Sequence, residues 1–118
     1  MSALQEPTGA APRDPVAATF RLMAAGDGRY TAEGPLTFAT ARRARDLGER
    51  LVNGAGGAAL EIDCAGVSAS DSAGLAVLID WLGTARRAGR TLRCTHLPPG
   101  LTALARISEV EELLDRGV

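Results

Sequence analysis

Hydrophobic positions recur along this chain with two different periods, which predict a short series of strands and helices. Residues 58–64 read Ala-Ala-Leu-Glu-Ile-Asp-Cys, so apolar and acidic side chains alternate. This alternation predicts a strand in a sheet that is covered mainly on one face. Farther along, Leu75, Leu78, Ile79 and Leu82 recur at the three- and four-residue spacing of a helix. That helix is expected to run from about Ser72 to Ala88.

The chain before residue 58 predicts a hairpin and one helix. Residues 20–24 and 29–33 read as two strands around the turn at 26–28. Gly34 and Pro35 are expected to break the second strand. Thr37 is then expected to cap a helix that runs to about Asn53, and the glycine-rich residues 54–57 should form a flexible connection. The buried face of that helix is predicted from spacing alone and comprises Phe38, Ala41, Ala44, Leu47 and Leu51.

The remaining elements complete an α/β fold. Residues 91–95 predict a fourth strand, a helix should follow from Pro98 to about Ile107, and 110–114 read as a last short helix. Strands separated by helices of this length usually pair in parallel through right-handed crossovers. The expected order is β-β-α-β-α-β-α, with a mixed four-stranded sheet, an antiparallel hairpin at one side and three to four helices. Residues 1–17 are rich in proline and small residues and predict a disordered tail, with one domain over 18–118.

Composition narrows the possible functions. The net charge is −1 and every basic side chain is arginine, so no strong positive field attracts nucleic acid. No apolar stretch approaches the length that spans a bilayer, and the first residues lack a secretory leader, so a cytoplasmic protein without direct membrane insertion is expected. Cys64 and Cys94 should then be reduced and buried in the core.

The polar residues that could form a functional site lie between the predicted strand at 58–64 and the helix that follows it. Residues 71–75 read Asp-Ser-Ala-Gly-Leu. Asp71 is a favourable cap for a helix, and Ser72 then presents its hydroxyl at a helix N-terminus with free backbone N–H groups. The lone histidine, His96, makes a hydrolase with Ser72 an alternative, but the surrounding sequence is not a Gly-x-Ser-x-Gly elbow. The spacing of cysteines and glycines predicts neither a metal site nor a nucleotide cradle, and no cofactor is expected.

The remaining interpretation is that another protein binds the segment around Ser72. Ser68, Ser70, Asp71 and Ser72 should cluster at the carboxyl end of the sheet, where ligands and partners usually meet open α/β folds. Small residues after Ser72 would let a partner approach closely. Phosphorylation of Ser72 would place about two negative charges there. An ordinary capped helix start remains the plain alternative.

The segment at 67–78 resembles the signature of STAS domains, which include bacterial anti-sigma factor antagonists. In those proteins an Asp-Ser-(Ser/Thr)-Gly-Leu loop carries a phosphorylated serine. The resemblance extends to the preceding Leu-x-Ile-Asp strand and the following Ala-Arg-Arg-Ala-Gly-Arg-x-Leu segment. The order of elements over about residues 18–115 is similar to that fold.

Two subgroups of the family compete. Antagonists usually carry a second hydroxyl residue where this chain has Ala73, whereas Asp-Ser-Ala-Gly-Leu-Ala followed by Asp80-Trp81-Leu82 resembles the MlaB-type accessory subunit of a phospholipid-transport ABC system. That resemblance implies a non-enzymatic, cytoplasmic domain, held at the inner membrane through the transporter, which binds the ATPase subunit. The alternative is an antagonist phosphorylated on Ser72 by an anti-sigma factor serine kinase. The expected partner-binding residues are Ser72, Asp71, Ala73, Gly74, Leu75 and Ser70, bordered by Leu36, Thr37 and Thr40.

Trp81 falls beside the centre of the apolar stripe of its helix. Partial burial against a neighbouring element is the simpler expectation. Contact with a partner or a second copy is the other.

Overall fold

The structure is a computed structural model that describes residues 19–54 and 57–116. Four strands form one mixed sheet in the order β2-β3-β4-β5. The hairpin of β2 and β3 is antiparallel, and β4 and β5 add to it in parallel. Along the chain the elements are β2 (Arg21–Gly26), β3 (Arg29–Leu36), α1 (Ala41–Gly54), β4 (Ala59–Ser70), α2 (Ser72–Arg87), β5 (Thr91–Thr95), α3 (Pro99–Ile107) and α4 (Glu111–Arg116). The expected fold class is confirmed.

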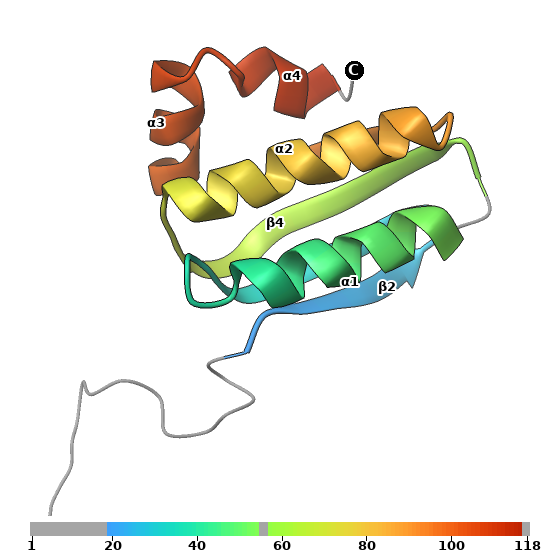
Figure 1. The fold of residues 1–118 in the computed structure, drawn as a ribbon, viewed down its shortest axis with the longest axis horizontal. Helices are drawn as coiled ribbons and strands as arrows, with labels where there is room; N and C mark the ends of the chain where they lie inside the picture. The colour runs from blue at the N-terminus through green and yellow to red at the C-terminus, as the bar shows by residue number, and fades with distance from the viewer. Residues whose placement is uncertain (1–18, 55–56, 117–118) are drawn as a thin grey trace, which may run out of the picture.

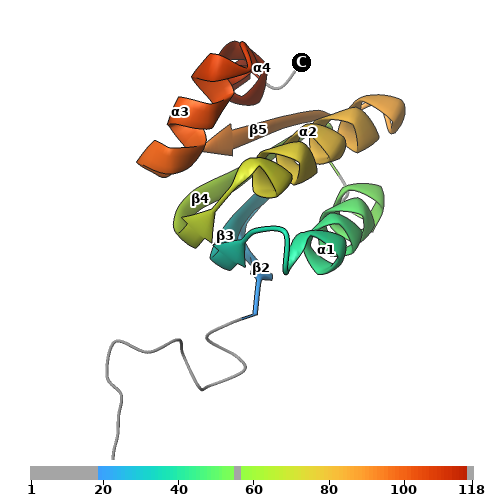
Figure 2. The same ribbon diagram turned by 60° about the vertical axis from the view of Figure 1, so that its left-hand side comes forward.

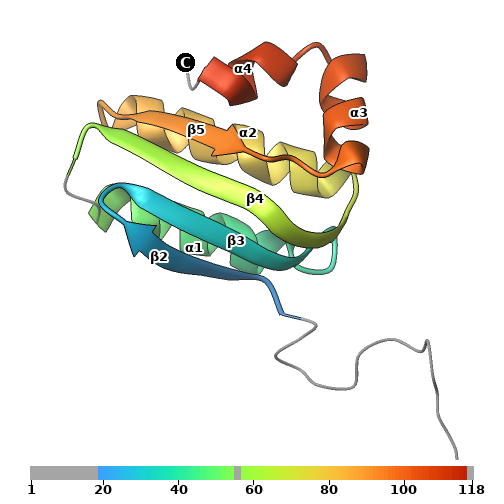
Figure 3. The same ribbon diagram turned by 180° about the vertical axis from the view of Figure 1, so that it is seen from behind.

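The helices are distributed unevenly over the sheet. Helices α1 and α2 lie side by side across one face, as Figure 1 shows. Seen from behind in Figure 3, the strands stand in front of these two helices, while α3 and α4 lie beyond β5. Figure 2 shows α3 close to the start of α2. Among the described residues no helix covers the second face, which agrees with the alternation in β4.

One hydrophobic core lies between the sheet and the two helices. It takes Phe20 just before β2, the inward side chains of β3, β4 and β5, and the inner faces of α1 and α2. Helices α3 and α4 add Leu101, Ala105 and Leu114 to it. Cys64 and Cys94 belong to this core as free thiols. The fully buried large side chains are Trp81, Phe20, Leu36, Ile62, Leu78, Leu92, Leu101, Leu114 and Val52.

Trp81 is the central contact between the two long helices. Its ring is completely buried, its indole N–H donates to the Ala44 carbonyl oxygen at 3.1 Å, and its ring centroid lies 5.9 Å from that of Phe20. A methyl group on Gly48 would collide with the indole, so α1 can approach α2 only because residue 48 has no side chain. Burial is therefore complete where partial burial was expected, and the alternative of a partner contact at Trp81 is wrong.

Strands β3 and β4 both extend beyond the bounds predicted from the sequence. Gly34 and Pro35 do not end β3, and β4 continues six residues beyond Cys64, because β3 and β4 stay paired from Glu33 with Gly66 to Leu36 with Ser70. A methyl group on Gly66 would lie 2.9 Å from the Ala32 carbonyl oxygen, so glycine is what permits the ladder to run through this point.

The first long helix begins later than expected. It starts at Ala41, and residues 37–40 form a turn before it. The Thr40 hydroxyl accepts the Thr37 N–H at 3.0 Å and donates to the Pro35 carbonyl oxygen at 2.8 Å, so it ties the turn together. The expected tail at 1–17 and part of the expected flexible connection, residues 55–56, lie outside the described residues.

Candidate functional site

Ser72 is the first residue of α2 and its side chain is exposed. Only Asp71 separates it from the end of β4, so the chain turns sharply from the sheet into the helix at this point. Within 19–54 and 57–116, no hydrogen bond to the Ser72 hydroxyl is present. The hydroxyl therefore stands at a helix N-terminus, where the backbone carries a partial positive charge and free N–H groups.

Asp71 joins the start of α2 to the turn before α1. As the N-cap residue it accepts the Gly74 N–H through Oδ1 at 3.1 Å, and through Oδ2 it accepts the Phe38 N–H at 3.0 Å. The hydrogen bond from Phe38 is the largest cause of a lowered pKa of Asp71; partial desolvation opposes it, and the Gly74 and Ala73 amides add to it. The expected N-cap role is confirmed, and the same carboxylate also fixes the neighbouring turn.

Phe38 lies on this turn with 84% of its surface exposed. The prediction that it belongs to the buried face of α1 is wrong, because the helix begins three residues later and the turn directs the ring outward. A single exposed apolar side chain is ordinary in a soluble protein. Phe38 differs because its backbone N–H is bonded to Asp71, so the turn that carries the ring is held next to the start of α2.

Several of the predicted partner-binding residues support this corner from within. Leu36 is completely buried, and Gly74 and Leu75 are buried as well. A methyl group on Gly74 would collide with the Leu36 carbonyl oxygen, so the start of α2 sits directly on the end of β3. The Leu36 and Leu75 side chains face the core, so they shape this surface from within.

The other predicted residues surround Ser72 at the surface. Ala73, Thr37, Thr40 and Ser70 are all partly exposed. On the side of Ser70 the neighbour is the start of α3, where a methyl group on Gly100 would lie 3.7 Å from the Ser70 hydroxyl oxygen. Ser72 is thus flanked by the Phe38 turn on one side and by α3 on the other.

A shallow groove of about 360 Å³ runs from this corner between the two long helices. Near Phe38 the groove is lined by small apolar side chains, and farther along it is lined by charged ones. Phe38, Ala41 and Arg45 line it from the side of α1, and Ala73, Ala76, Val77 and Asp80 line it from α2. One carboxylate oxygen of Asp80, Oδ2, is enclosed and has no hydrogen-bond partner in the described part of the chain.

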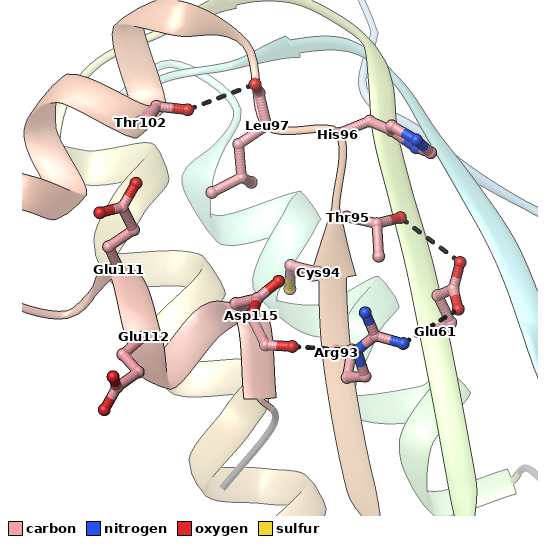
Figure 4. A pocket seen from close by; sticks show the side chains of 10 residues that line it. All are labelled: Glu61, Arg93, Cys94, Thr95, His96, Leu97, Thr102, Glu111, Glu112 and Asp115. Atoms are coloured by element: carbon pink, nitrogen blue, oxygen red, sulfur yellow. Dashed lines mark hydrogen bonds and ion pairs between the residues drawn. The ribbon is translucent and has the colours of Figure 1, made fainter.

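A larger hollow of about 760 Å³ lies elsewhere, between β5 and the two C-terminal helices (Figure 4). Its one arginine is already engaged within the domain. Arg93 donates to the backbone carbonyl oxygen of Asp115 at 2.9 Å and lies 3.8 Å from the Glu61 carboxylate. The hollow brings together none of the residues around Ser72.

The structure also separates Ser72 from His96. The His96 imidazole lies 3.1 Å from the Asp63 carboxylate, next to the end of β5, which pairs there with β4. Strand β4 continues for seven residues from Asp63 to Ser70, about 23 Å at roughly 3.3 Å per residue. His96 therefore cannot serve as a base for Ser72, and the hydrolase alternative loses its geometric support.

The two cysteines lie next to one another in the core. Contact with the Cys64 thiol, together with burial, holds the pKa of Cys94 well above its usual range. The Cys94 sulfur is therefore not a ready nucleophile or metal ligand. Across the described ranges, no three His, Cys, Asp or Glu side chains are grouped to hold a metal ion.

Over the same described ranges, no helix is long and apolar enough to cross a bilayer.

A comparison with protein-family models matches residues 22–115 to the family described as "Mlab, STAS domain". The chain belongs to this STAS domain family. Members are typically non-catalytic domains that mediate contacts between proteins. The exposed surface around Ser72 is therefore a candidate protein-binding site.

Solved structures give the same fold. The anti-sigma factor antagonist SpoIIAA in its unphosphorylated form superposes with a TM-score of 0.64, at 11% sequence identity, over 80% of this chain and 84% of that chain. At such low identity the likeness shows the fold alone. No curated protein matches the chain by sequence.

The sequence prediction missed Phe38 and the groove beside it. Phe38 fits the three- and four-residue spacing of α1, so its apolar character was assigned to the core. The signal that could have found it is the pair of threonines around it, since threonine side chains often bond to nearby backbone and form turns.

Proposed function

We propose that this domain is an accessory subunit that binds the cytoplasmic ATPase of a phospholipid-transport ABC complex, with Ser72 at the centre of the contact. The observation that carries the proposal is that an exposed hydroxyl, with no hydrogen bond inside 19–54 and 57–116, and an exposed aromatic ring lie on two segments that Asp71 ties together. The membership of the chain in the Mlab family of STAS domains supports this kind of partner. In this proposal the protein is cytoplasmic and reaches the inner membrane only through the transporter.

The arrangement suits binding by contact. Ser72, Ala73 and Phe38 present a hydroxyl, a methyl group and a ring with little backbone freedom, because Asp71 ties their two segments together. Rigid aromatic anchors with small neighbours are typical of the energetically important centre of a protein interface. The domain itself contributes no reaction in this proposal; its role is to support assembly and activity of the ATPase.

The test is the affinity of the purified domain for the ATPase subunit of the phospholipid-transport complex from the same organism. Ser72→Glu should weaken binding by about 30-fold or more, because it places an unpaired charge in the buried contact. Ser108→Glu adds the same charge at an exposed position just after the end of α3, outside the proposed contact, and should leave binding almost unchanged. Failure of the unchanged domain to bind, or equal effects of both variants, would contradict the proposal.

The second candidate is an anti-sigma factor antagonist whose partner is a serine kinase. The same exposed hydroxyl favours it, since a phosphate at Ser72 would sit at a helix N-terminus that stabilises negative charge. Incubation with an anti-sigma factor serine kinase and ATP, followed by mass spectrometry, distinguishes the two. Phosphate on Ser72 supports the antagonist, and an unmodified serine together with ATPase binding supports the transporter subunit.

A further inference from the structure

The groove between α1 and α2 begins at the proposed contact and leads away from it along α2. Ala73, Ala76 and Asp80 share one face of the helix because they are spaced by three and four residues. Asp80 comes eight residues after Ser72, which is about 12 Å along the helix axis. A partner segment seated on Phe38 and Ala73 would therefore reach Asp80 after about two helical turns.

The far end of the groove carries two charges of opposite sign, one on each wall. In the described part of the chain, neither Arg45 on α1 nor Asp80 on α2 forms an ion pair. Arg45 is exposed, whereas Asp80 is partly buried and its Oδ2 is enclosed without a donor. More than nine in ten buried polar groups in folded proteins have a hydrogen-bond partner, so this oxygen is an exception that needs an explanation.

We propose that the groove is the extension of the partner surface and that Asp80 pairs there with a Lys or Arg side chain of the partner, while Arg45 meets a partner carboxylate. This proposal rests on the proposed function. The apolar first half of the groove would take a hydrophobic side chain beside Phe38, and the charged second half would set the register of the segment. Of the two Asp80 carboxylate oxygens only Oδ2 is enclosed, so a donor that arrives in the groove would meet the carboxylate through Oδ1.

The two charges should contribute unequally. Asp80 lies partly enclosed, so loss of its charge would leave the cation of the partner unpaired inside the interface, which is the costly case. Arg45 lies at the exposed rim, where water and salt screen an ion pair. A partner without a basic residue at this point would fit the groove poorly, so Asp80 would also distinguish partners.

The experiment measures the dissociation constant for the same ATPase subunit with four versions of the domain. Asp80→Asn should weaken binding by about 30-fold or more, and Arg45→Gln by less than about 5-fold. Asp46→Asn is the matched control, because it removes the same charge from an exposed position on α1 outside the groove. Raising the salt concentration should weaken the unchanged domain more than the Asp80→Asn variant.

Two results would overturn the proposal. In the first, Asp80→Asn binds as tightly as Asp46→Asn although Ser72→Glu still abolishes binding; the proposed function then stands and the role of Asp80 is wrong. In the second, Asp80→Asn and Arg45→Gln each lower the free energy of unfolding in urea, and do so non-additively. Arg45 and Asp80 then pair with each other in solution. If the unchanged domain does not bind the ATPase, both the function and this extension fall.

Discussion

Two aromatic side chains lie at opposite extremes of exposure along the same pair of helices. Trp81 is completely buried between α1 and α2, with its N–H bonded and its ring against Phe20. Phe38, on the turn that leads into α1, is 84% exposed. The comparison separates the part of the helix pair that holds the fold together from the part that is free to meet another protein.

The difference lies in what each ring is attached to. Trp81 is fixed by its side chain, which fills the space left by Gly48 and donates to a backbone oxygen. Phe38 is fixed by its backbone, through the hydrogen bond from its N–H to Asp71, and its ring does not pack into the core. A fixed backbone suits an interface anchor, because only the rotamer freedom of the ring remains to be lost when the partner arrives.

The largest expected effect is on the buried side of this comparison. Trp81→Ala should lower the free energy of unfolding by about 3–5 kcal/mol, since it removes the largest core side chain and leaves a cavity. Gly48→Ala should cost about 1–3 kcal/mol, because its methyl group collides with the indole. Gly54→Ala, in the same helix but facing open space, is the control and should change little. Urea denaturation followed by circular dichroism measures all three, and a stable Trp81→Ala variant would contradict the packing.

The next effect is on binding and should leave stability untouched. Phe38→Ala should weaken binding to the ATPase subunit by about 10- to 30-fold, as truncation of an aromatic anchor does. Its free energy of unfolding should stay within about 0.5 kcal/mol of the unchanged domain, because the ring has few neighbours. Ile107→Ala is the matched control, since Ile107 is 80% exposed but lies at the end of α3. If both variants bind alike, exposure alone explains Phe38 and it is no anchor.

The smallest effect concerns the link between the two segments. The lowered pKa of Asp71 means that folding favours its carboxylate over its protonated form. Its contribution to stability should therefore be complete above about pH 4, the ordinary range of an Asp side chain, and be lost as the pH falls below it. Asp71→Asn keeps an oxygen acceptor for the helix start and should remove this part of the pH dependence.

The measurement for Asp71 is urea denaturation between pH 6 and pH 3 for both proteins. Asp71→Ala, which removes the cap altogether, should cost about 0.5–2 kcal/mol at neutral pH. Parallel pH profiles for the unchanged domain and Asp71→Asn would show that the carboxylate charge makes no contribution. In that case the turn at Phe38 is held by other contacts, and the distinction between its fixed backbone and free ring weakens.

The fold followed from the sequence wherever the side-chain pattern and the backbone pairing agree. The alternation that ends at Cys64 predicted the first half of β4, and the stripe from Leu75 to Leu82 predicted α2. Beyond Cys64 the pattern disappears, yet the strand continues, because the backbone of β3 supplies partners for small residues such as Gly66. Long-range pairing of this kind leaves no periodic mark in the sequence.

The site was predicted in its polar part and missed in its apolar part. The residue types of Asp71 and Ser72 alone predict a helix start. In the structure Asp71 makes the capping hydrogen bond that this prediction requires, by accepting the Gly74 N–H. Phe38 was assigned to the buried face and Trp81 was expected to be only partly buried, since spacing alone cannot tell a turn from the helix that follows it. What decides their positions is local hydroxyl bonding at Thr40 and the absence of a side chain at Gly48.

The close seat of Gly74 on the Leu36 carbonyl has a mechanical consequence. At this point helix α2 cannot move closer to the end of β3, because the backbone of Gly74 already lies against the Leu36 carbonyl. A side chain larger than glycine at position 74 would therefore push the start of α2 away from the sheet, and with it the surface that Ser72 presents.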